Sequence, residues 1–339
     1  MTTDHEAVRE LLGAWAVGAL MPGDERTVAP HLAECDPCAA EAARLRAAVR
    51  HLDGPPVTDE HAPAADRGLA LALRTRPAIP PTAAHAAPYA AAVSGLHALL
   101  GELAEHDRAW GTPVVHDWDV HDTVAHLLAA DEPLAVRLGL RAPGPWDGVD
   151  GSPWRTAWAE RTQEVLGRER GRTPAQTVAS WRNQASDLLS APEAHDVELA
   201  GRATTLMGAR LPLADHFLVR AFEAWVHTED IGRALDRPVP PPLSPHLWQL
   251  VRLAVRILDL ALGSKEPAVA LTVAQEDDAV SWVLGSGADP VSAELVLRPV
   301  DFCLLMGGRV DPAEVPRGVS GSESAADLVL ARAASLAWL

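Results

Sequence analysis

The sequence predicts a mainly α protein built from three parts: a small helical domain at the N-terminus, a four-helix bundle, and a C-terminal α+β domain. Three observations lead to this fold class. Residues 83–237 carry long runs of apolar residues at helical spacing, whereas residues 268–298 show the alternation typical of strands. Between residues 53 and 82, six prolines interrupt the helical pattern. A chain of 339 residues is also too long for a single hydrophobic core.

The composition excludes several classes of protein. Apolar residues make up 48% of the chain, which is enough to build hydrophobic cores. The formal charge of −17 argues against direct binding of nucleic acid through a basic face. No run of eighteen apolar residues occurs, and the first ten residues are polar and acidic, so we expect neither a membrane span nor a secretory signal. Three cysteines cannot form a disulfide framework, which favours a reducing cytoplasm.

Residues 1–76 are predicted to form the N-terminal domain, with short helices up to residue 52. Apolar residues share one face of the first and third helices: Val8, Leu11, Leu12 and Trp15, then Leu45, Val49 and Leu52. Pro30 is expected to kink the second helix or to make it restart just before His31. Residues 53–82 are interpreted as a linker, in which residues 66–76 form either a short helix or part of a disordered tether.

Residues 83–240 predict four helices, at residues 85–106, 119–140, 173–191 and 213–235. Asp119 is the expected N-cap of the second helix. Thr173 is the expected N-cap of the third, with Pro174 at the first helical position. Long amphipathic helices joined by loops are typical of a four-helix bundle.

Residues 245–339 predict an α+β domain. A helix over residues 246–262 comes first, followed by three strand-like stretches at residues 268–275, 279–285 and 292–299. Helical spacing returns at residues 299–309 and 324–339, which completes the α+β pattern.

The first candidate site consists of His31, Cys35 and Cys38. Thiolates and imidazoles suit zinc, and on a helix residues three and four apart face the same way, so these three donors can converge. His5, on the first predicted helix, is the natural fourth ligand of a closed tetrahedral site. Two alternatives stand beside zinc: a pair of small buried hydrophobes, or a redox pair, although no strand precedes the motif as it does in thioredoxin-like proteins.

His5 followed by His31, Cys35 and Cys38 and then by an amphipathic helix resembles the zinc-containing anti-sigma factor domain. The resemblance covers residues 1–76. It implies a small helical domain that wraps an extracytoplasmic-function sigma factor and blocks its access to RNA polymerase. It also implies that the helices after Cys38 and around Leu69 supply the contacts, as helices in grooves. The zinc is either structural, which is the preferred interpretation, or lost when Cys35 and Cys38 oxidise.

The second candidate site consists of His126, Glu223 and His227. Glu223 and His227 are four residues apart on one predicted helix, and His126 lies on another helix of the same bundle. Two histidines and one carboxylate leave coordination positions open, which suits a reactive or ligand-binding metal. Asp122, Asp131 and Asp230 are available to orient the histidine rings. Spacing alone favours the alternative of two hydrogen-bonded histidines and a solvated glutamate.

The stretches "WDVHDTVAHLLAADE" and "RAFEAWVHTEDIGRAL" resemble the mycothiol-dependent maleylpyruvate isomerase family. The resemblance covers residues 83–339. It implies a DinB-like metal-binding four-helix bundle and a small C-terminal domain related to sterol-carrier folds. By this resemblance His126, Glu223 and His227 would bind a divalent metal, usually zinc, and a thiol such as mycothiol would become a nucleophile there. Arg309, in "GGR", is a candidate for holding a substrate carboxylate; the alternative is a surface charge at the end of a helix.

These resemblances lead to two main functional hypotheses. The first is a cytoplasmic anti-sigma factor, in which residues 1–76 hold the sigma factor and the remainder senses a small molecule. The second is a mycothiol-dependent transferase or isomerase with an accessory zinc domain. A purely structural module is a third reading. Cys303, in an apolar run, is interpreted as a buried hydrophobe.

Overall fold

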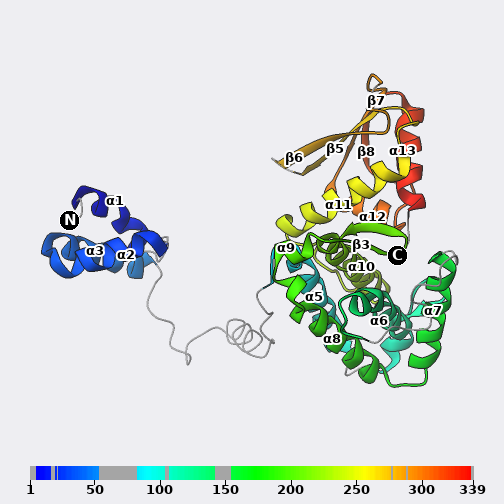
Figure 1. The fold of residues 1–339 in the computed structure, drawn as a ribbon, viewed down its shortest axis with the longest axis horizontal. Coiled ribbons are helices and arrows are strands. Elements are labelled where there is room, and N and C mark those ends of the chain that lie inside the picture. Colours follow the sequence, from blue (N-terminus) through cyan, green and yellow to red (C-terminus); the bar gives the residue numbers. More distant parts are fainter. Residues whose placement is uncertain are drawn as a thin grey trace. The chain divides into compact units, whose positions relative to one another are not determined.

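A computed structural model of the chain describes residues 5–16, 20, 22–52, 82–103, 107–141, 154–275, 278–287 and 289–336. The chain divides into two compact units, Met1–Ala78 and Ile79–Leu339 (Figure 1). Each unit is described by itself. The predicted helix at residues 66–76 lies outside the described residues.

The first unit is a small helical domain. Its helices are α1 (His5–Ala16), α2 (Pro22–Glu34) and α3 (Asp36–Leu52). The helices contact one another around a core of five buried residues: Val8, Leu12, Val28, Cys38 and Ala42. Trp15 packs at the edge of this core, with the guanidinium of Arg46 3.5 Å from the centre of its ring. This core is small, so burial alone gives the unit little stability.

Helix α2 continues through Pro30, and the expected restart before His31 is wrong. A proline removes one backbone hydrogen bond, and here the remaining bonds of α2 keep the helix in one piece. The break comes at Cys35 instead, between α2 and α3. Cys35 still accepts a hydrogen bond from the amide of Ala39 and donates one to the carbonyl of His31, so the chain turns there without losing its helical path.

A four-helix bundle forms the first part of the second unit. It consists of α5 (Ala87–Leu103), α6 (Val120–Arg137), α8 (Pro174–Ser190) and α10 (Leu213–Ala234). Helix α10 packs against α5 and α6, and α8 packs against α6 and α5. These four helices confirm the predicted ones. A further helix, α7 (Trp154–Glu169), lies against α6 and was not predicted.

Short elements join the bundle helices. Two hairpins, also not predicted, are β1 (Pro113–Val115) with β2 (Trp118–Asp119), and β3 (Ala203–Leu206) with β4 (Ala209–Pro212). The others are 3-10 turns at Asp107–Gly111 and Pro192–Ala194, and α9 (Val197–Ala200). The first hairpin leads directly into α6 and the second into α10, so each hairpin fixes the N-terminal end of a bundle helix.

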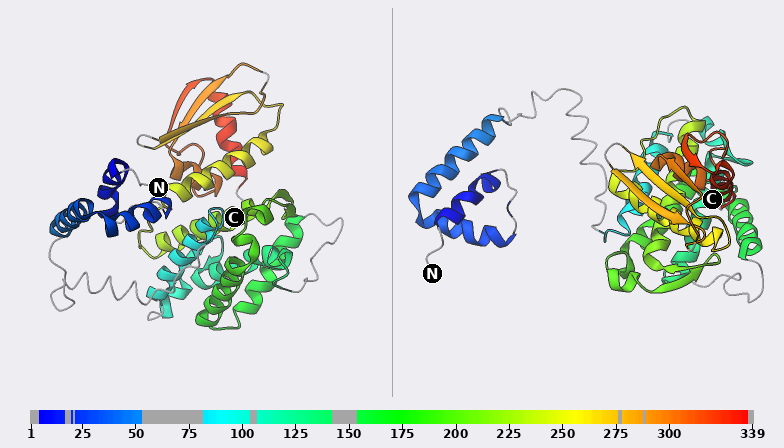
Figure 2. Two further views of the ribbon diagram at one scale, coloured as in Figure 1. Left: turned by 60° about the vertical axis from the view of Figure 1, so that its left-hand side comes forward. Right: turned by 90° about the horizontal axis from the view of Figure 1, so that it is seen from above.

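The C-terminal part is a four-stranded sheet with helices on one face (Figures 1 and 2). Its elements are α11 (Ser244–Leu262), β5 (Val269–Gln275), β6 (Asp278–Leu284), β7 (Ala293–Leu297), α12 (Pro299–Met306), β8 (Arg317–Gly321) and α13 (Glu323–Ser335). The strand order is β6-β5-β7-β8, in which β5 and β7 are parallel and the other pairs antiparallel.

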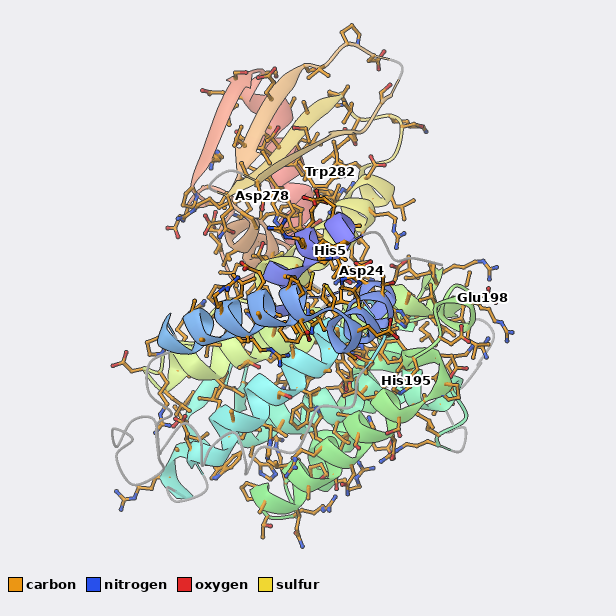
Figure 3. All side chains as sticks on the ribbon, turned by 90° about the vertical axis from the view of Figure 1, so that its left-hand side faces the viewer. His5, Asp24, His195, Glu198, Asp278 and Trp282 are labelled. Atoms are coloured by element: carbon orange, nitrogen blue, oxygen red, sulfur yellow. The ribbon has the colours of Figure 1, made fainter. Side chains whose placement is uncertain are left out.

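Alternation along the strands decides which face of the sheet is buried. Val269, Leu271 and Val273 of β5 are buried, and they pair with Ala293, Leu295 and Leu297 of β7. On the edge strand β6, the half-buried Trp282 pairs with Leu271 and packs on this same core (Figure 3). Helices α11, α12 and α13 cover that face.

The observed architecture confirms the predicted mainly α fold class. One hydrophobic core runs from the bundle into the C-terminal part, so the predicted boundary at residues 240–245 stays a prediction. In the part of the chain that the structure describes, no helix is both long and apolar enough to cross a bilayer.

The predicted N-caps are confirmed. The Asp119 side chain accepts a hydrogen bond from the backbone of Asp122 at the start of α6. Thr173 forms a capping box with Gln176 at the start of α8: each side chain accepts a hydrogen bond from the other residue's backbone amide. Pro174 occupies the first helical position.

We expect Thr173→Ala to lower the free energy of unfolding by about 1 kcal/mol, because the backbone amide of Gln176 at the start of α8 loses its acceptor, the Thr173 hydroxyl. Urea unfolding of the full chain, followed by circular dichroism, measures this. Ser186→Ala, at an exposed position in the same helix, is the control and should change stability by less than about 0.5 kcal/mol. Equal effects of the two substitutions would contradict the role of the cap.

Candidate functional site

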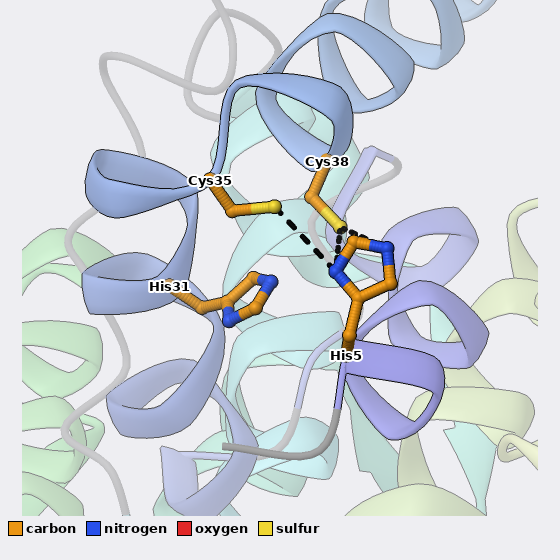
Figure 4. A group of neighbouring side chains, drawn as sticks. All are labelled: His5, His31, Cys35 and Cys38. Carbon is orange, nitrogen blue, oxygen red and sulfur yellow. Dashed lines mark hydrogen bonds between the residues drawn. The ribbon is translucent and has the colours of Figure 1, made fainter. Parts of the chain in front are cut away.

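The first predicted site is assembled in the small helical unit (Figure 4). His5 comes from the start of α1, His31 from the end of α2, Cys35 from the junction and Cys38 from the first turn of α3. One donor atom from each of the four lies within 4.8 Å of the others. The Nδ1 atom of His5 is 3.5 Å from Cys35 Sγ and 3.6 Å from Cys38 Sγ. Residues 33 positions apart in the sequence therefore meet at one point.

The chemistry and spacing of these four donors fit a zinc ion. With Zn–S near 2.3 Å and Zn–N near 2.0 Å, a tetrahedral site has N···S edges of about 3.6 Å. The two His5–cysteine distances match that value. The Nε2 atom of His31 is buried and has no hydrogen-bond partner among the described residues, as expected for a ligand atom. The donors are two soft thiols and two imidazoles, which is the Cys₂His₂ set of structural zinc sites.

The alternative of two buried hydrophobes fits this geometry less well. Cys38 is buried, but Cys35 is half-buried, and both sulfurs lie within hydrogen-bond distance of the His5 ring (Figure 4). Burial raises the pKa of the Cys38 thiol, and the neighbouring Cys35 raises it further. Without a cation the Cys38 thiol therefore resists ionisation, whereas zinc binding would displace its proton.

The second predicted site is assembled inside the bundle. His126 comes from α6, and Glu223 and His227 come from α10. Their donor atoms also lie within 4.8 Å of one another, and the three side chains are nearly inaccessible to solvent, at 2%, 1% and 0% exposure. His126 Nε2 lies 2.9 Å from Glu223 Oε1, which is a direct hydrogen bond. The sequence interpretation of Glu223 as a solvated charge is therefore ruled out by its burial.

Each charge in this second cluster has a partner on its far side. Arg220, one turn before Glu223, places Nη1 2.5 Å from Glu223 Oε2 and 2.7 Å from the carbonyl oxygen of Ala130. His227 Nδ1 lies 3.1 Å from Asp230 Oδ2. A carboxylate can only accept, so the proton of the His227 ring belongs on Nδ1, which leaves Nε2 as the free lone pair.

Arg309 completes this chain of contacts. It follows α12 and donates to both oxygens of Asp230, with an Nη2–Oδ2 distance of 2.6 Å. Its side chain is only 6% exposed, so the interpretation of Arg309 as a surface charge is wrong. The candidate substrate-binding arginine thus lies beside the second site and acts on His227 through Asp230.

The pKa values of the cluster follow from these pairings. For Glu223, burial raises the pKa, but the charge of Arg220 and the hydrogen bond to His126 outweigh it and bring the pKa to about 2. For Asp230, burial is likewise outweighed by His227 and Arg309, and the pKa is about 2. Burial lowers the pKa of His227 to about 4, against the opposing effect of Asp230. At pH 7 the cluster therefore offers a carboxylate and a neutral imidazole, the forms that bind metals.

Two of the three aspartates predicted to orient the histidines lie elsewhere. Asp122 forms a bidentate ion pair with Arg170, at 2.7 and 2.8 Å. Asp131 accepts a hydrogen bond from the Tyr89 hydroxyl at 2.6 Å. Only Asp230 faces a histidine of the cluster. All three lie near the histidines in sequence, but helical phase turns two of them toward other helices.

Aromatic rings enclose the second cluster on the side of His126. The ring centroid of Trp118, from the first hairpin, is 4.5 Å from that of His126, and that of Trp158, from α7, is 5.8 Å away. The sequence interpretation missed both tryptophans as well as Arg220. Arg220 had a signal, because it shares the helical stripe of Glu223; the tryptophans had none, because they come from elements that were not predicted.

The residues of the second cluster can hold a divalent metal. His227 Nε2 and His126 Nδ1 are buried and without a hydrogen-bond partner among the described residues. Two neutral imidazoles and a carboxylate are also the donor set of many catalytic zinc sites. His126 Nδ1 is the free atom because Nε2 lies 2.9 Å from Glu223 Oε1; a site that used Nε2 instead would have to break this hydrogen bond, since the edge of a zinc tetrahedron is about 3.4 Å.

Comparison with known protein families gives two matches, one for each part of the chain that carries a candidate site. Residues 89–232 match the family described as "Mycothiol maleylpyruvate isomerase N-terminal domain". Residues 6–39 match the family described as "Putative zinc-finger". The first match includes all three residues of the second cluster, and the second includes His31, Cys35 and Cys38. Both resemblances predicted from the sequence are thereby confirmed. No curated protein matches the chain.

Two solved structures also match the chain at low identity. One is titled "Crystal structure of the mycothiol-dependent maleylpyruvate isomerase": it is 14% identical, the match covers 70% of this chain and 92% of that one, and the TM-score is 0.48. The other is of a mutant of that enzyme, again 14% identical, with coverage of 69% and 91% and a TM-score of 0.47.

We expect Cys35→Ser or His31→Ala to unfold residues 5–52 and to remove one zinc ion per chain, because the core of this unit is too small to hold it without the metal. Zinc analysis and circular dichroism measure the two effects. Cys303→Ala is the control, since Cys303 is buried in the second unit and should leave the zinc of the first unit in place. Unchanged helicity and zinc content in Cys35→Ser would contradict the assigned ligands.

We expect Arg309→Met to destabilise the second unit by about 3–5 kcal/mol, because it leaves the buried charge of Asp230 without its main partner. The control is Arg317→Met, which breaks a partly exposed pair with Asp327 and should cost less than about 1 kcal/mol. Urea unfolding of both variants measures the two losses in the free energy of unfolding. Equal stability of the two would mean that Arg309 does not anchor Asp230.

Proposed function

We propose that the chain is a zinc-binding anti-sigma factor: residues 1–76 hold an extracytoplasmic-function sigma factor, and residues 83–339 form a sensor related to thiol-dependent enzymes. One observation carries the proposal: a Cys₂His₂ cluster with zinc spacing lies in a small helical unit separate from the rest of the chain. The match of residues 6–39 to a zinc-finger family supports it. A zinc domain with so small a core has little use except to present its surface to a partner.

The first unit would bind its partner through helix surfaces that the zinc ion holds in place. On α3, Cys38 and Ala42 face the core, whereas Arg44, Arg46 and Ala47 are exposed. An exposed helical face next to a rigid metal clip suits helix-in-groove recognition of a protein. The overall charge of −17 also argues against nucleic acid as the partner.

The second unit would act through the His126, Glu223 and His227 cluster. These side chains would hold a divalent metal, and when bound the metal would lower the pKa of a thiol ligand. Asp230 holds the proton of His227 on Nδ1, and Arg220 keeps Glu223 ionised. A small molecule bound here would release the sigma factor only if it binds the holding and releasing states with different affinity.

A second candidate function is a mycothiol-dependent transferase or isomerase. The observation that favours it is the match of residues 89–232 to the isomerase family, which includes the complete His126, Glu223 and His227 set. In this reading the zinc domain is an accessory, and Arg309 contributes by fixing Asp230 and through it the ring of His227.

Purification of the intact protein from its own cells, with metal analysis on the same sample, separates the two functions. The regulator predicts a copurifying sigma factor and about two metal ions per chain, one for each candidate site. The complex should be lost in Cys35→Ser and kept in Cys303→Ala. Two metal ions without any sigma factor, together with metal-dependent consumption of mycothiol, would instead establish the enzyme.

A further inference from the structure

The second unit contains a cavity that lies apart from both candidate metal sites. Its volume is about 300 Å³, which is at the lower end of the range for small-molecule pockets. None of the seven candidate metal ligands lines it. Helices α6, α10 and α11 and the β3–β4 hairpin supply most of the wall, with apolar side chains that include Leu134, Leu206, Leu211, Val219 and Ile257. A wall of this kind favours apolar contents over polar ones.

The buried arginine in the wall, Arg220, has its charge balanced inside the protein. Its Nη1 atom lies 2.5 Å from Glu223 Oε2 and 2.7 Å from the carbonyl oxygen of Ala130. Its Nη2 atom is inaccessible, so it offers no donor to a ligand. Burial raises the pKa of a second nearby carboxyl group, Asp131, to about 7, against the opposing effect of Arg220. With two carboxyl groups beside it, Arg220 does not require a charged ligand.

The other ionisable groups of the wall add no buried charge. His216 is 5% exposed, and its Nε2 atom lies 3.2 Å from the carbonyl oxygen of Thr204. Burial lowers the pKa of His216, so its ring is neutral at pH 7. Arg155 is exposed, with its guanidinium 4.8 Å from the centre of the Trp154 ring, and a solvated guanidinium needs no anion inside the cavity. Among the residues that the structure describes, no aspartate or glutamate lines the cavity.

The hairpin side of the wall is preformed. Met207 and Gly208, the two residues of the turn, both have positive φ angles, of 49° and 73°. A Cβ atom at Gly208 would lie 2.3 Å from Nε1 of Trp154, so the indole packs directly against the glycine backbone. All three residues line the cavity. The turn fixes the backbone of this wall, whereas the flexible side chain of Met207 can adapt to the shape of an apolar ligand.

Water is a poor occupant of such a cavity. A buried water molecule needs several polar partners. Here the guanidinium of Arg220 and the ring of His216 already have partners within the protein. Water held against the apolar wall would therefore be released favourably when an apolar molecule replaces it.

We propose that this cavity binds a neutral, mainly apolar small molecule about the size of two fused rings. Its body would lie against Leu134, Val219 and Ile257. Arg220 lines the cavity and also contacts Glu223 of the second cluster, so the molecule is a natural effector of the proposed sensor. That regulatory role rests on the proposed function, whereas the binding itself does not.

The test is calorimetric titration of the full-length protein at pH 7 with 2-naphthol and with 2-naphthoate, which carry the same two rings in a neutral and in an anionic molecule. We expect 2-naphthol to bind with a dissociation constant below about 1 mM. The anion should bind at least about tenfold more weakly, because its carboxylate would lose water without gaining a partner in the wall.

Two variants locate the binding. Ala209→Phe fills the cavity from β4 and should weaken 2-naphthol at least about tenfold. The matched control is Ala279→Phe, the same substitution at an exposed position of β6, which should leave the affinity unchanged. Circular dichroism establishes whether each variant folds. If Ala209→Phe does not fold, Ala130→Leu fills the cavity from α6 instead.

Three results would overturn the proposal. They are no binding of 2-naphthol at concentrations about threefold above the expected dissociation constant, equal or tighter binding of 2-naphthoate, and unchanged affinity in a folded cavity-filling variant. No sigma factor is present in these titrations, so their failure is distinct from a failure of the anti-sigma function. If 2-naphthol binds but does not change sigma-factor retention, only the regulatory role is lost.

Discussion

The second unit is organised around the buried charges of a single helix. Five ionisable side chains of α10 recur at three- and four-residue steps and are all buried: His216, Arg220, Glu223, His227 and Asp230. A buried charge costs several kcal/mol unless it is paired and hydrogen-bonded. Each of these groups therefore requires a partner from another element. The partners are the backbone of β3, His126 and a carbonyl of α6, and Arg309 after α12. The pairing requirement thus fixes how the hairpin, α6 and the C-terminal part pack on α10.

The first unit differs from the second, because it has few groups to bury. Its core holds five buried residues, of which Cys38 is itself a candidate metal ligand. If this cluster binds a metal, the ion would link α1, α2 and α3, and its removal would break that link. Metal binding and folding are then one equilibrium in this unit. In the second unit, by contrast, the large core that holds α10 and its neighbours exists independently of any ion. The first candidate metal site would therefore be part of the structure of its unit, whereas the second lies within a large core.

The sequence predicted what depends on local patterns. Helical spacing identified the four bundle helices, and capping chemistry identified Asp119 and Thr173. Ligand spacing indicated the first candidate metal cluster, whereas the second also needed the family resemblance. It could not predict α7, either hairpin or β8, because these elements are short or are held by tertiary contacts rather than by their own periodicity. The same limit explains which residues of the second candidate site were predicted and which were missed. Glu223 and His227 were visible because they share one helix, but Arg309 meets Asp230 across 79 residues, and such pairs depend on how helices rotate against one another.

The burial of the second cluster bears on both candidate functions. Its three donors are at most 2% exposed, and Trp118 and Trp158 lie against His126. A thiol can reach these donors only if neighbouring side chains move, so an enzyme would have to open this site in every turnover. A sensor needs the same property, namely two states of which only one admits the ligand. Shifting such an equilibrium from 1:99 to 99:1 takes a difference in affinity of about 10⁴-fold. A closed site of this kind can supply a large difference, because in the closed state the ligand has almost no access to the donors. An enclosed donor cluster of this kind is therefore suited to act as a switch without any change in its donor residues.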